Sequence, residues 1–273
     1  MEKFAWGEMT WPEINQASKE GRVAILPVAT IEDHGPHLPV DTDVLITNEI
    51  CLHTGKKIPK EVVVIPPVIH GYSPHHMDFP GCITIGGKTF IDYVLDITKS
   101  IAHHGFRKIL IVNGHGSNVP FMDIVSRLTI IERPDVQCAM ISWWSLGPVV
   151  EAIKKHRESE FPGGMTHACE LETSLYLALK PELVDMSRAV KDISFPKSEY
   201  FWFDLASGGR TTHPPATMME YWSTLSKTGV IGDPTKATVE KGNAFLKAAV
   251  KGLIELVRDL KARGIRERVD HHS

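Results

Sequence analysis

Short apolar runs alternate with longer amphipathic segments along this chain. The runs are typical of strands buried on both faces, because apolar side chains occupy consecutive positions. We expect strands at residues 23–28, 62–65, 108–112 and 136–141. Helical spacing and capping residues predict helices at residues 10–21, 42–53, 89–104, 120–133, 149–159, 170–179 and 235–263. This alternation predicts an α/β protein whose mostly parallel central sheet is covered by helices on both faces, giving three α/β/α layers.

Capping residues and breakers refine these boundaries. Thr10 and Glu13 form a capping-box pattern at the first helix, and Pro12 falls in its first turn. Residues 66–81 are rich in Pro, His and Gly, which predicts a long shaped loop. Residues 185–232 carry many Pro, Ser, Gly and aromatic residues, and their pattern does not indicate which elements they form.

Length and composition indicate an ordinary globular protein. The 273 residues contain no low-complexity linker and no internal repeat, which predicts a single domain over residues 1–273. The net charge of −3 gives no reason to expect a nucleic acid or an anionic membrane as a partner. Four widely spaced cysteines, without a Cys-x-x-Cys pair, and the lack of a signal-peptide pattern predict reduced thiols in a cytoplasmic protein.

Side chains that bind metals are concentrated directly after the first strand. Within residues 32–43 stand Glu32, His34, His37, Asp41 and Asp43. Glu32 and His34 are two positions apart, so an extended backbone directs both to the same side. Burying such groups unpaired would cost several kcal/mol each, so we expect them to be exposed, paired or bound to a metal. Their density favours a metal or catalytic site.

Two further clusters follow the same pattern. Residues 113–118, Asn-Gly-His-Gly-Ser-Asn, come directly after another buried strand and place His115 at a sharp turn. Residues 163–173 place His167 just before a helix that carries Glu172. Glu170 fits an ordinary acidic residue in the first helical turn, whereas Glu172 faces another way and could reach the site.

These residue types suit particular metals and a particular chemistry. Carboxylates and imidazoles without thiolates are suitable ligands for Zn, Mn, Fe or Co. A carboxylate such as Asp43 can bridge two ions about 3.5–4 Å apart, and a metal lowers the pKa of bound water to about 7. A histidine off the metal could then move protons to a leaving group.

Together the three clusters resemble the creatininase (creatinine amidohydrolase) family. The family patterns Glu-x-His-Gly-x-His-Leu-Pro-x-x-Thr-Asp, Asn-Gly-His-x-x-Asn and His-Ala-x-x-x-Glu-Thr-Ser stand at residues 32–43, 113–118 and 167–174. The resemblance implies a creatininase-like α/β/α fold and homo-oligomers, which are hexamers in creatininase itself. It also implies one or two divalent ions per chain, of Zn, Mn or Fe.

Roles for individual residues come from the same resemblance. Glu32, Asp43 and His115 would hold one ion, and His34 would hold a second ion with Asp43 as the bridge. His167 would be the catalytic residue that transfers protons. Glu172 would sit beside the metals.

The chain departs from creatininase at two positions. Ser117 stands where creatininase has a glutamate that serves the second metal, so Glu172 takes over or the second site is weak or empty. Gly163 stands where creatininase has a tryptophan that closes over its flat substrate. Both changes make creatinine an unexpected substrate.

The polar loops suggest what the site binds instead. We predict that Ser73, His76 and Ser117 contact the substrate. The His-rich loop at residues 70–78 and the polar stretch at residues 210–213 would suit a hydroxylated molecule.

The sequence therefore predicts a divalent-metal hydrolase that opens a small cyclic substrate by attack of metal-bound hydroxide on a carbonyl. A cyclic amide of the creatinine type is ranked first, and a keto-cyclitol such as a dehydro-inosose second. One alternative is a non-catalytic, metal-stabilised binding or assembly protein, motivated by Ser117. A peptide-processing role is the other alternative.

Overall fold

A parallel four-stranded sheet lies at the centre of the fold. The computed structural model describes residues 2–206 and 216–272. The sheet contains β1 (Val23–Val28), β2 (Val62–Val64), β3 (Lys108–Asn113) and β4 (Gln137–Ser142). These strands lie in the order β2-β1-β3-β4, and every neighbouring pair is parallel. The predicted α/β class with a parallel sheet is confirmed.

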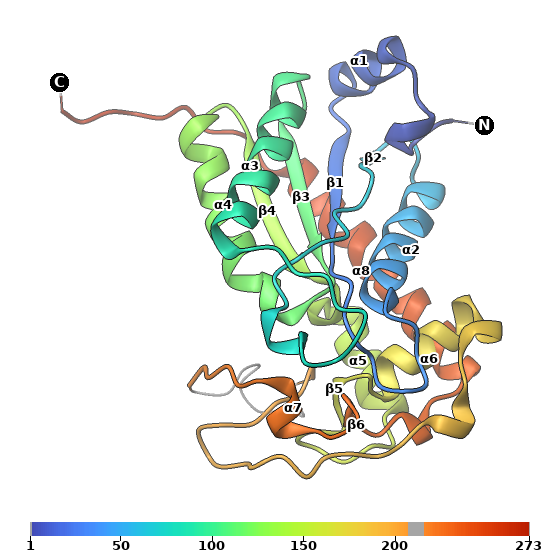
Figure 1. The fold of residues 1–273 in the computed structure, drawn as a ribbon. Coiled ribbons are helices and arrows are strands. Elements are labelled where there is room, and N and C mark those ends of the chain that lie inside the picture. Colours follow the sequence, from blue (N-terminus) through green and yellow to red (C-terminus); the bar gives the residue numbers. More distant parts are fainter. Residues whose placement is uncertain (1, 207–215, 273) are drawn as a thin grey trace.

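Helices cover both faces of this sheet (Figure 1). One face packs against α1 (Trp11–Lys19), α3 (Gly87–His103) and α4 (Val119–Glu132). The other face packs against α2 (Thr42–Lys57), α5 (Gly147–His156), α6 (Glu170–Leu179) and α8 (Val239–Ala262). The short helix α7 (Trp222–Leu225) and an antiparallel pair, β5 (Met165–His167) and β6 (Ile231–Gly232), lie beyond the carboxyl ends of the strands (Figure 1).

The continuous apolar run of β1 is explained by its position between two hydrophobic cores. Successive side chains on a strand point to opposite faces. Val23 and Ile25 join the core formed with α2 and α8, whereas Ala24 and Leu26 join the core formed with α1, α3 and α4. All four are fully buried, so the strand has no polar face.

The helix boundaries differ from the predicted ones by a few residues, and two of these differences have clear physical reasons. Helix α2 continues past Gly55 to Lys57, because Gly55 serves packing rather than termination: a Cβ there would lie 2.2 Å from the ring of Phe4. Helix α8 begins at Val239, because Thr238 caps it by accepting a hydrogen bond from the N–H of Lys241 at 3.2 Å. The predicted capping box of Thr10 and Glu13 is present at α1.

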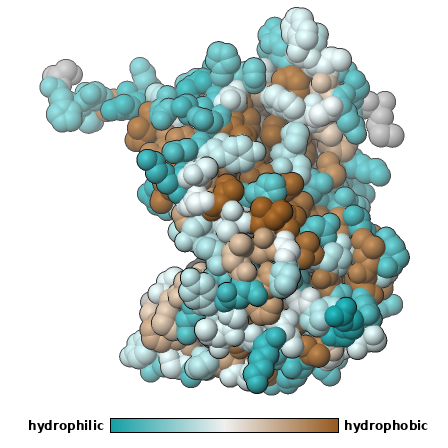
Figure 2. All heavy atoms as spheres, viewed as in Figure 1, coloured by the Kyte–Doolittle hydropathy of each residue, from teal (hydrophilic) through white to brown (hydrophobic). Residues whose placement is uncertain are grey.

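The surface mixes polar and apolar residues. In the part of the chain described above, no helix is both long and apolar enough to cross a membrane. Figure 2 shows hydrophobic residues gathered near the middle of the face that is viewed there, between more hydrophilic regions.

Candidate metal centre

The ends of β1 and β3 bring the first two clusters together. Val28 at the end of β1 pairs with Asn113 at the end of β3, so the loops that follow start at the same level of the sheet. Asn113 shapes its turn by donating from Nδ2 to the carbonyl of His115 at 2.7 Å. Gly114 lets the turn approach α2, since a Cβ at Gly114 would lie 1.7 Å from Thr47 Oγ1.

The first group of facing ligand atoms contains Glu32, Asp43 and His115. His115 Nδ1 lies 3.1 Å from Glu32 Oε1 and 3.2 Å from Asp43 Oδ2. Its other ring nitrogen, Nε2, donates to the carbonyl of Tyr72 at 3.2 Å, so Nδ1 is the nitrogen that faces the carboxylates. Burial lowers the pKa of His115, but the nearby carboxylates of Glu32 and Asp43 outweigh it and raise that pKa to about 10.

The second group lies on the other side of Asp43. His34 Nε2 is 3.3 Å from Asp43 Oδ1 and 3.9 Å from Glu172 Oε1. Glu172 stands in the first turn of α6, where its Oε2 accepts the N–H of Cys169 at 3.2 Å and leaves Oε1 toward His34. Burial opposes charge on His34, yet Asp43 and Glu172 raise its pKa well above the ordinary value.

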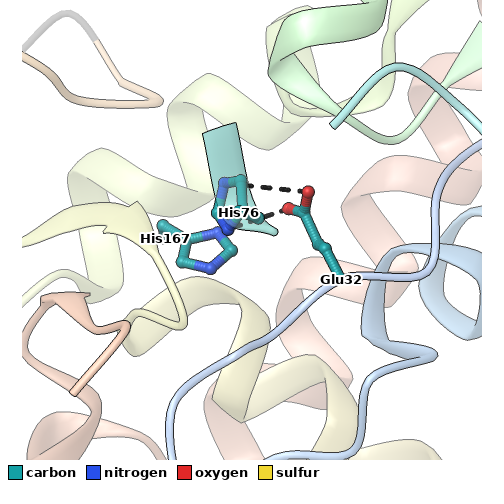
Figure 3. A group of neighbouring side chains, drawn as sticks. All are labelled: Glu32, His76 and His167. Carbon is teal, nitrogen blue, oxygen red and sulfur yellow. Dashed lines mark ion pairs between the residues drawn. The ribbon is translucent and has the colours of Figure 1, made fainter. Parts of the chain in front are cut away.

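A third group joins the same carboxylate, Glu32, to two histidines (Figure 3). His167 Nδ1 lies 3.6 Å from Glu32 Oε1, and His76 Nε2 lies 3.7 Å from Glu32 Oε2. The ring centres of His76 and His167 are 4.7 Å apart. Burial raises the pKa of Glu32, but His115 and His76 outweigh it and lower that pKa well below the ordinary value.

The donor set fits divalent cations. Within the described residues, His34 Nε2 and Asp43 Oδ2 are buried without a hydrogen-bond partner. Asp43 directs one oxygen at His34 and the other at His115, as a bridging carboxylate would. Buried polar atoms without partners are costly, and nitrogen and carboxylate ligands suit Zn and Mn, so two adjacent ions would satisfy these atoms.

The three residues predicted to contact substrate are also buried here, each with a protein partner. Ser73 donates its hydroxyl to Glu32 Oε2. Ser117 Oγ lies 3.1 Å from Nε2 of His75, and His76 Nδ1 donates to Asp33. The polar stretch at residues 210–213 lies outside the described residues.

Glu170 faces away from the site, as predicted, but it is not an exposed capping acid. It is fully buried and accepts hydrogen bonds from Lys241 Nζ at 2.6 Å and from the N–H of Ser159 at 2.9 Å. The first turn of α6 therefore has two acidic residues with separate tasks, since Glu172 faces His34.

Two residues near the site were missed by sequence reasoning. Asp33 lies between Glu32 and His34, and strand-like alternation directs it away from them. It nevertheless reaches His76, which the loop at residues 66–81 brings to that side. Trp222 stacks on His76 with ring centres 4.7 Å apart, and it comes from a segment without a recognisable pattern.

The fold and these clusters define an α/β protein of the metal-dependent hydrolase class. Residues 7–257 match the family model described as "Creatininase: Creatinine amidohydrolase". The chain therefore belongs to the creatininase family.

Relatives with different names are similar to this chain over most of its length. Creatinine amidohydrolase from Pseudomonas putida is 30% identical over 267 residues, covering 93% of this chain and 95% of that protein. A 3-dehydro-scyllo-inosose hydrolase from Thermotoga maritima is 28% identical, covering 93% and 83%. A mycofactocin precursor peptide peptidase from Mycolicibacterium smegmatis is 28% identical, covering 86% and 84%.

Solved creatininase structures share the fold. A crystal structure of creatinine amidohydrolase superposes with a TM-score of 0.81 at 26% identity, covering 97% of this chain and all of the other. A manganese form of creatininase gives a TM-score of 0.80 at 26% identity, covering 96% of this chain and all of the other. The predicted family is confirmed, while its members differ in substrate.

Proposed function

We propose that this protein is a divalent-metal hydrolase that opens a small cyclic substrate at a carbonyl carbon. The observation that carries the proposal is the placement of Asp43, whose two oxygens face His34 at 3.3 Å and His115 at 3.2 Å. Glu32, Asp43 and His115 would hold one ion, and His34, Asp43 and Glu172 the other. Divalent ions so held would supply Lewis acidity, which polarises a carbonyl and acidifies water.

His167 is the proposed proton-transferring residue. Its Nε2 lies 2.7 Å from the carbonyl oxygen of Asp33, which only accepts, so Nε2 carries the hydrogen. Nδ1 is then the nitrogen that faces Glu32 and the site. It takes a proton from the attacking water and returns it to the leaving group.

For the substrate we place a cyclic amide first and a keto-cyclitol close behind. Every side chain assigned to the site is less than a tenth exposed, which favours a small molecule. Gly163 and Ser117 are smaller than the residues that creatininase has there, which favours a substrate other than creatinine. Ser73, His76 and Ser117 are the proposed substrate contacts.

Two other functions have weaker support. Similarity to a peptide peptidase favours peptide processing, but the burial of the site residues disfavours an extended substrate. A binding or assembly role is favoured by Ser117, because its hydroxyl lies against His75 in place of a glutamate.

We also propose that the chain is one domain that forms a homo-oligomer. Helix α4 exposes Ile124, Ile130 and Ile131, the last at 74%. Strand β4 beside it is the edge of the sheet and is largely half-buried. An apolar helix beside an open sheet edge is suited to contact with a second copy.

The test is the metal content of protein purified without added metal. We expect two ions per chain, falling to one in Glu172→Ala, because Glu172 replaces the missing glutamate of the second site. His115→Ala should lose metal and hydrolase activity together. Glu182→Ala, an exposed glutamate close to α6, is the matched control and should keep both ions. Retention of both metal and activity in His115→Ala would refute the site assignment.

A further inference from the structure

Asp33 contacts two histidines of the site through two different oxygens. Its backbone carbonyl lies 2.7 Å from His167 Nε2, and its carboxylate Oδ1 lies 2.7 Å from His76 Nδ1. A carbonyl and an ionised carboxylate can only accept, so both ring nitrogens must donate.

The opposite nitrogens of the two rings face one carboxylate. His167 Nδ1 and His76 Nε2 lie 3.6 and 3.7 Å from the two oxygens of Glu32, which is too far for hydrogen bonds (Figure 3). A neutral imidazole has one N–H group, and both rings donate theirs to Asp33. Each ring therefore presents an unprotonated nitrogen to the same place in the site.

Trp222 packs against both of these rings. It stacks on His76 at 4.7 Å with an angle of 27° and meets His167 edge-on at 5.2 Å. Its Nε1 donates to the carbonyl of Gly229 at 3.0 Å. Gly229, with φ of +82°, lies so close to Asp33 that a Cβ there would be 2.1 Å from Oδ2. Gly229 therefore lies next to both the indole of Trp222 and the carboxylate of Asp33.

We propose that Asp33 is the positioning residue that fixes the ring tautomers of both His76 and His167. This inference rests on the proposed function and adds a requirement on the groups that the substrate carries beside its carbonyl. Two neighbouring unprotonated nitrogens beside a carboxylate accept hydrogen bonds and repel anions. The substrate therefore carries O–H or N–H groups beside its reacting carbonyl, as a cyclic polyol ketone or a ring amide does, and has no anionic group there.

The test reads the tautomers directly by NMR of metal-free protein labelled with ¹⁵N-histidine. Two-bond ¹H–¹⁵N correlations are recorded at about pH 8.5, two units above the ordinary imidazole pKa. His76 should carry its hydrogen on Nδ1 and His167 on Nε2, with the signals assigned from His76→Gln and His167→Gln. Wild-type protein alone can overturn the inference, which fails if His76 carries its hydrogen on Nε2.

The variant Asp33→Ala separates the two contacts. It removes the carboxylate but keeps the backbone carbonyl, so His76 should lose its fixed tautomer while His167 keeps the Nε2–H form. A merely structural role would change both rings or neither, and either result would overturn the inference. A metal content that contradicts the expectation would refute the proposed function but would not affect the tautomer measurements. The two proposals can therefore be refuted independently.

Discussion

In three of the site histidines, a backbone carbonyl determines which ring nitrogen faces the site. His34, His115 and His167 donate one ring N–H to the carbonyls of Glu32, Tyr72 and Asp33, at 3.5, 3.2 and 2.7 Å. A carbonyl cannot become a donor, so in each of these rings the nitrogen that faces the carbonyl carries the hydrogen. The path of the loops thereby determines the donor atoms of the site.

Metal binding at His115 should release a proton. In the metal-free protein its pKa is raised from 6.5 to about 10, so Nδ1 holds a proton at neutral pH and must lose it to bind a metal. This group therefore stabilises the metal-free fold fully below about pH 6.5, and that stabilisation is lost as the pH rises through about 10. Metal affinity should rise over the same range.

Calorimetric titration with Zn²⁺ at neutral pH, in buffers of different ionisation enthalpy, measures this release. His115→Gln should release about one proton fewer per chain than wild type. Equal release in the two proteins would contradict the assigned ligand atom.

The candidate site residues that the sequence predicted and those that it did not predict are positioned by different parts of the fold. Glu32, His34 and His115 follow strands directly, so the parallel sheet alone predicts that they meet. Asp33 and Trp222 depend on loops that fold back over the site. Such contacts depend on tertiary packing and leave no periodic signal.

At the scale of elements, α6 carries one site residue and one anchor in its first turn. Glu172 faces His34, while Glu170 joins α6 to α8 through Lys241 and to the preceding loop through Ser159. The anchor fixes the start of the helix whose first turn holds Glu172. Apolar spacing and capping residues predicted that α6 is a helix. The anchor was not predictable, because Glu170 can be buried only with its partner Lys241, which lies 71 residues further along the chain.

Glu170→Ala should destabilise the protein by about 1–3 kcal/mol, because it leaves the N–H of Ser159 without its acceptor and leaves Lys241 with Glu158 as its remaining carboxylate partner. Urea unfolding measures the change, and Glu182→Ala at an exposed position should stay within about 0.5 kcal/mol of wild type. Equal midpoints for the two variants would show that the buried pair does not anchor α6.

At the scale of the molecule, the candidate metal centre connects segments from distant parts of the chain. Its residues follow β1, begin α2, follow β3 and begin α6, so an ion held there links both halves of the described fold (Figure 1). A ligand that binds only the folded state stabilises it by mass action.

Added Zn²⁺ at 100 times its Kd should therefore stabilise the metal-free protein by about 2.7 kcal/mol. For a chain of this size that corresponds to a rise in Tm of roughly 5–10 °C. Differential scanning calorimetry measures it, and Asp43→Asn, which weakens the shared ligand of both ions, should show a smaller rise. An undiminished rise in this variant would place the stabilising ion elsewhere.

The pairing of β1 with β3 has a consequence for how the core can evolve. Sliding one strand by a single residue would move its loop by about 3.3 Å and exchange the side chains of the two hydrophobic layers. That displacement is as large as the 3.1 Å between His115 and Glu32, so the polar atoms tolerate no such slip. Ile25 and Leu110 are buried apolar residues that pair across the two strands. By fixing the register, such residues set the distances between the polar atoms of the site. Substitutions that change the size of these apolar residues are therefore constrained by the distances that the metal-centre residues require.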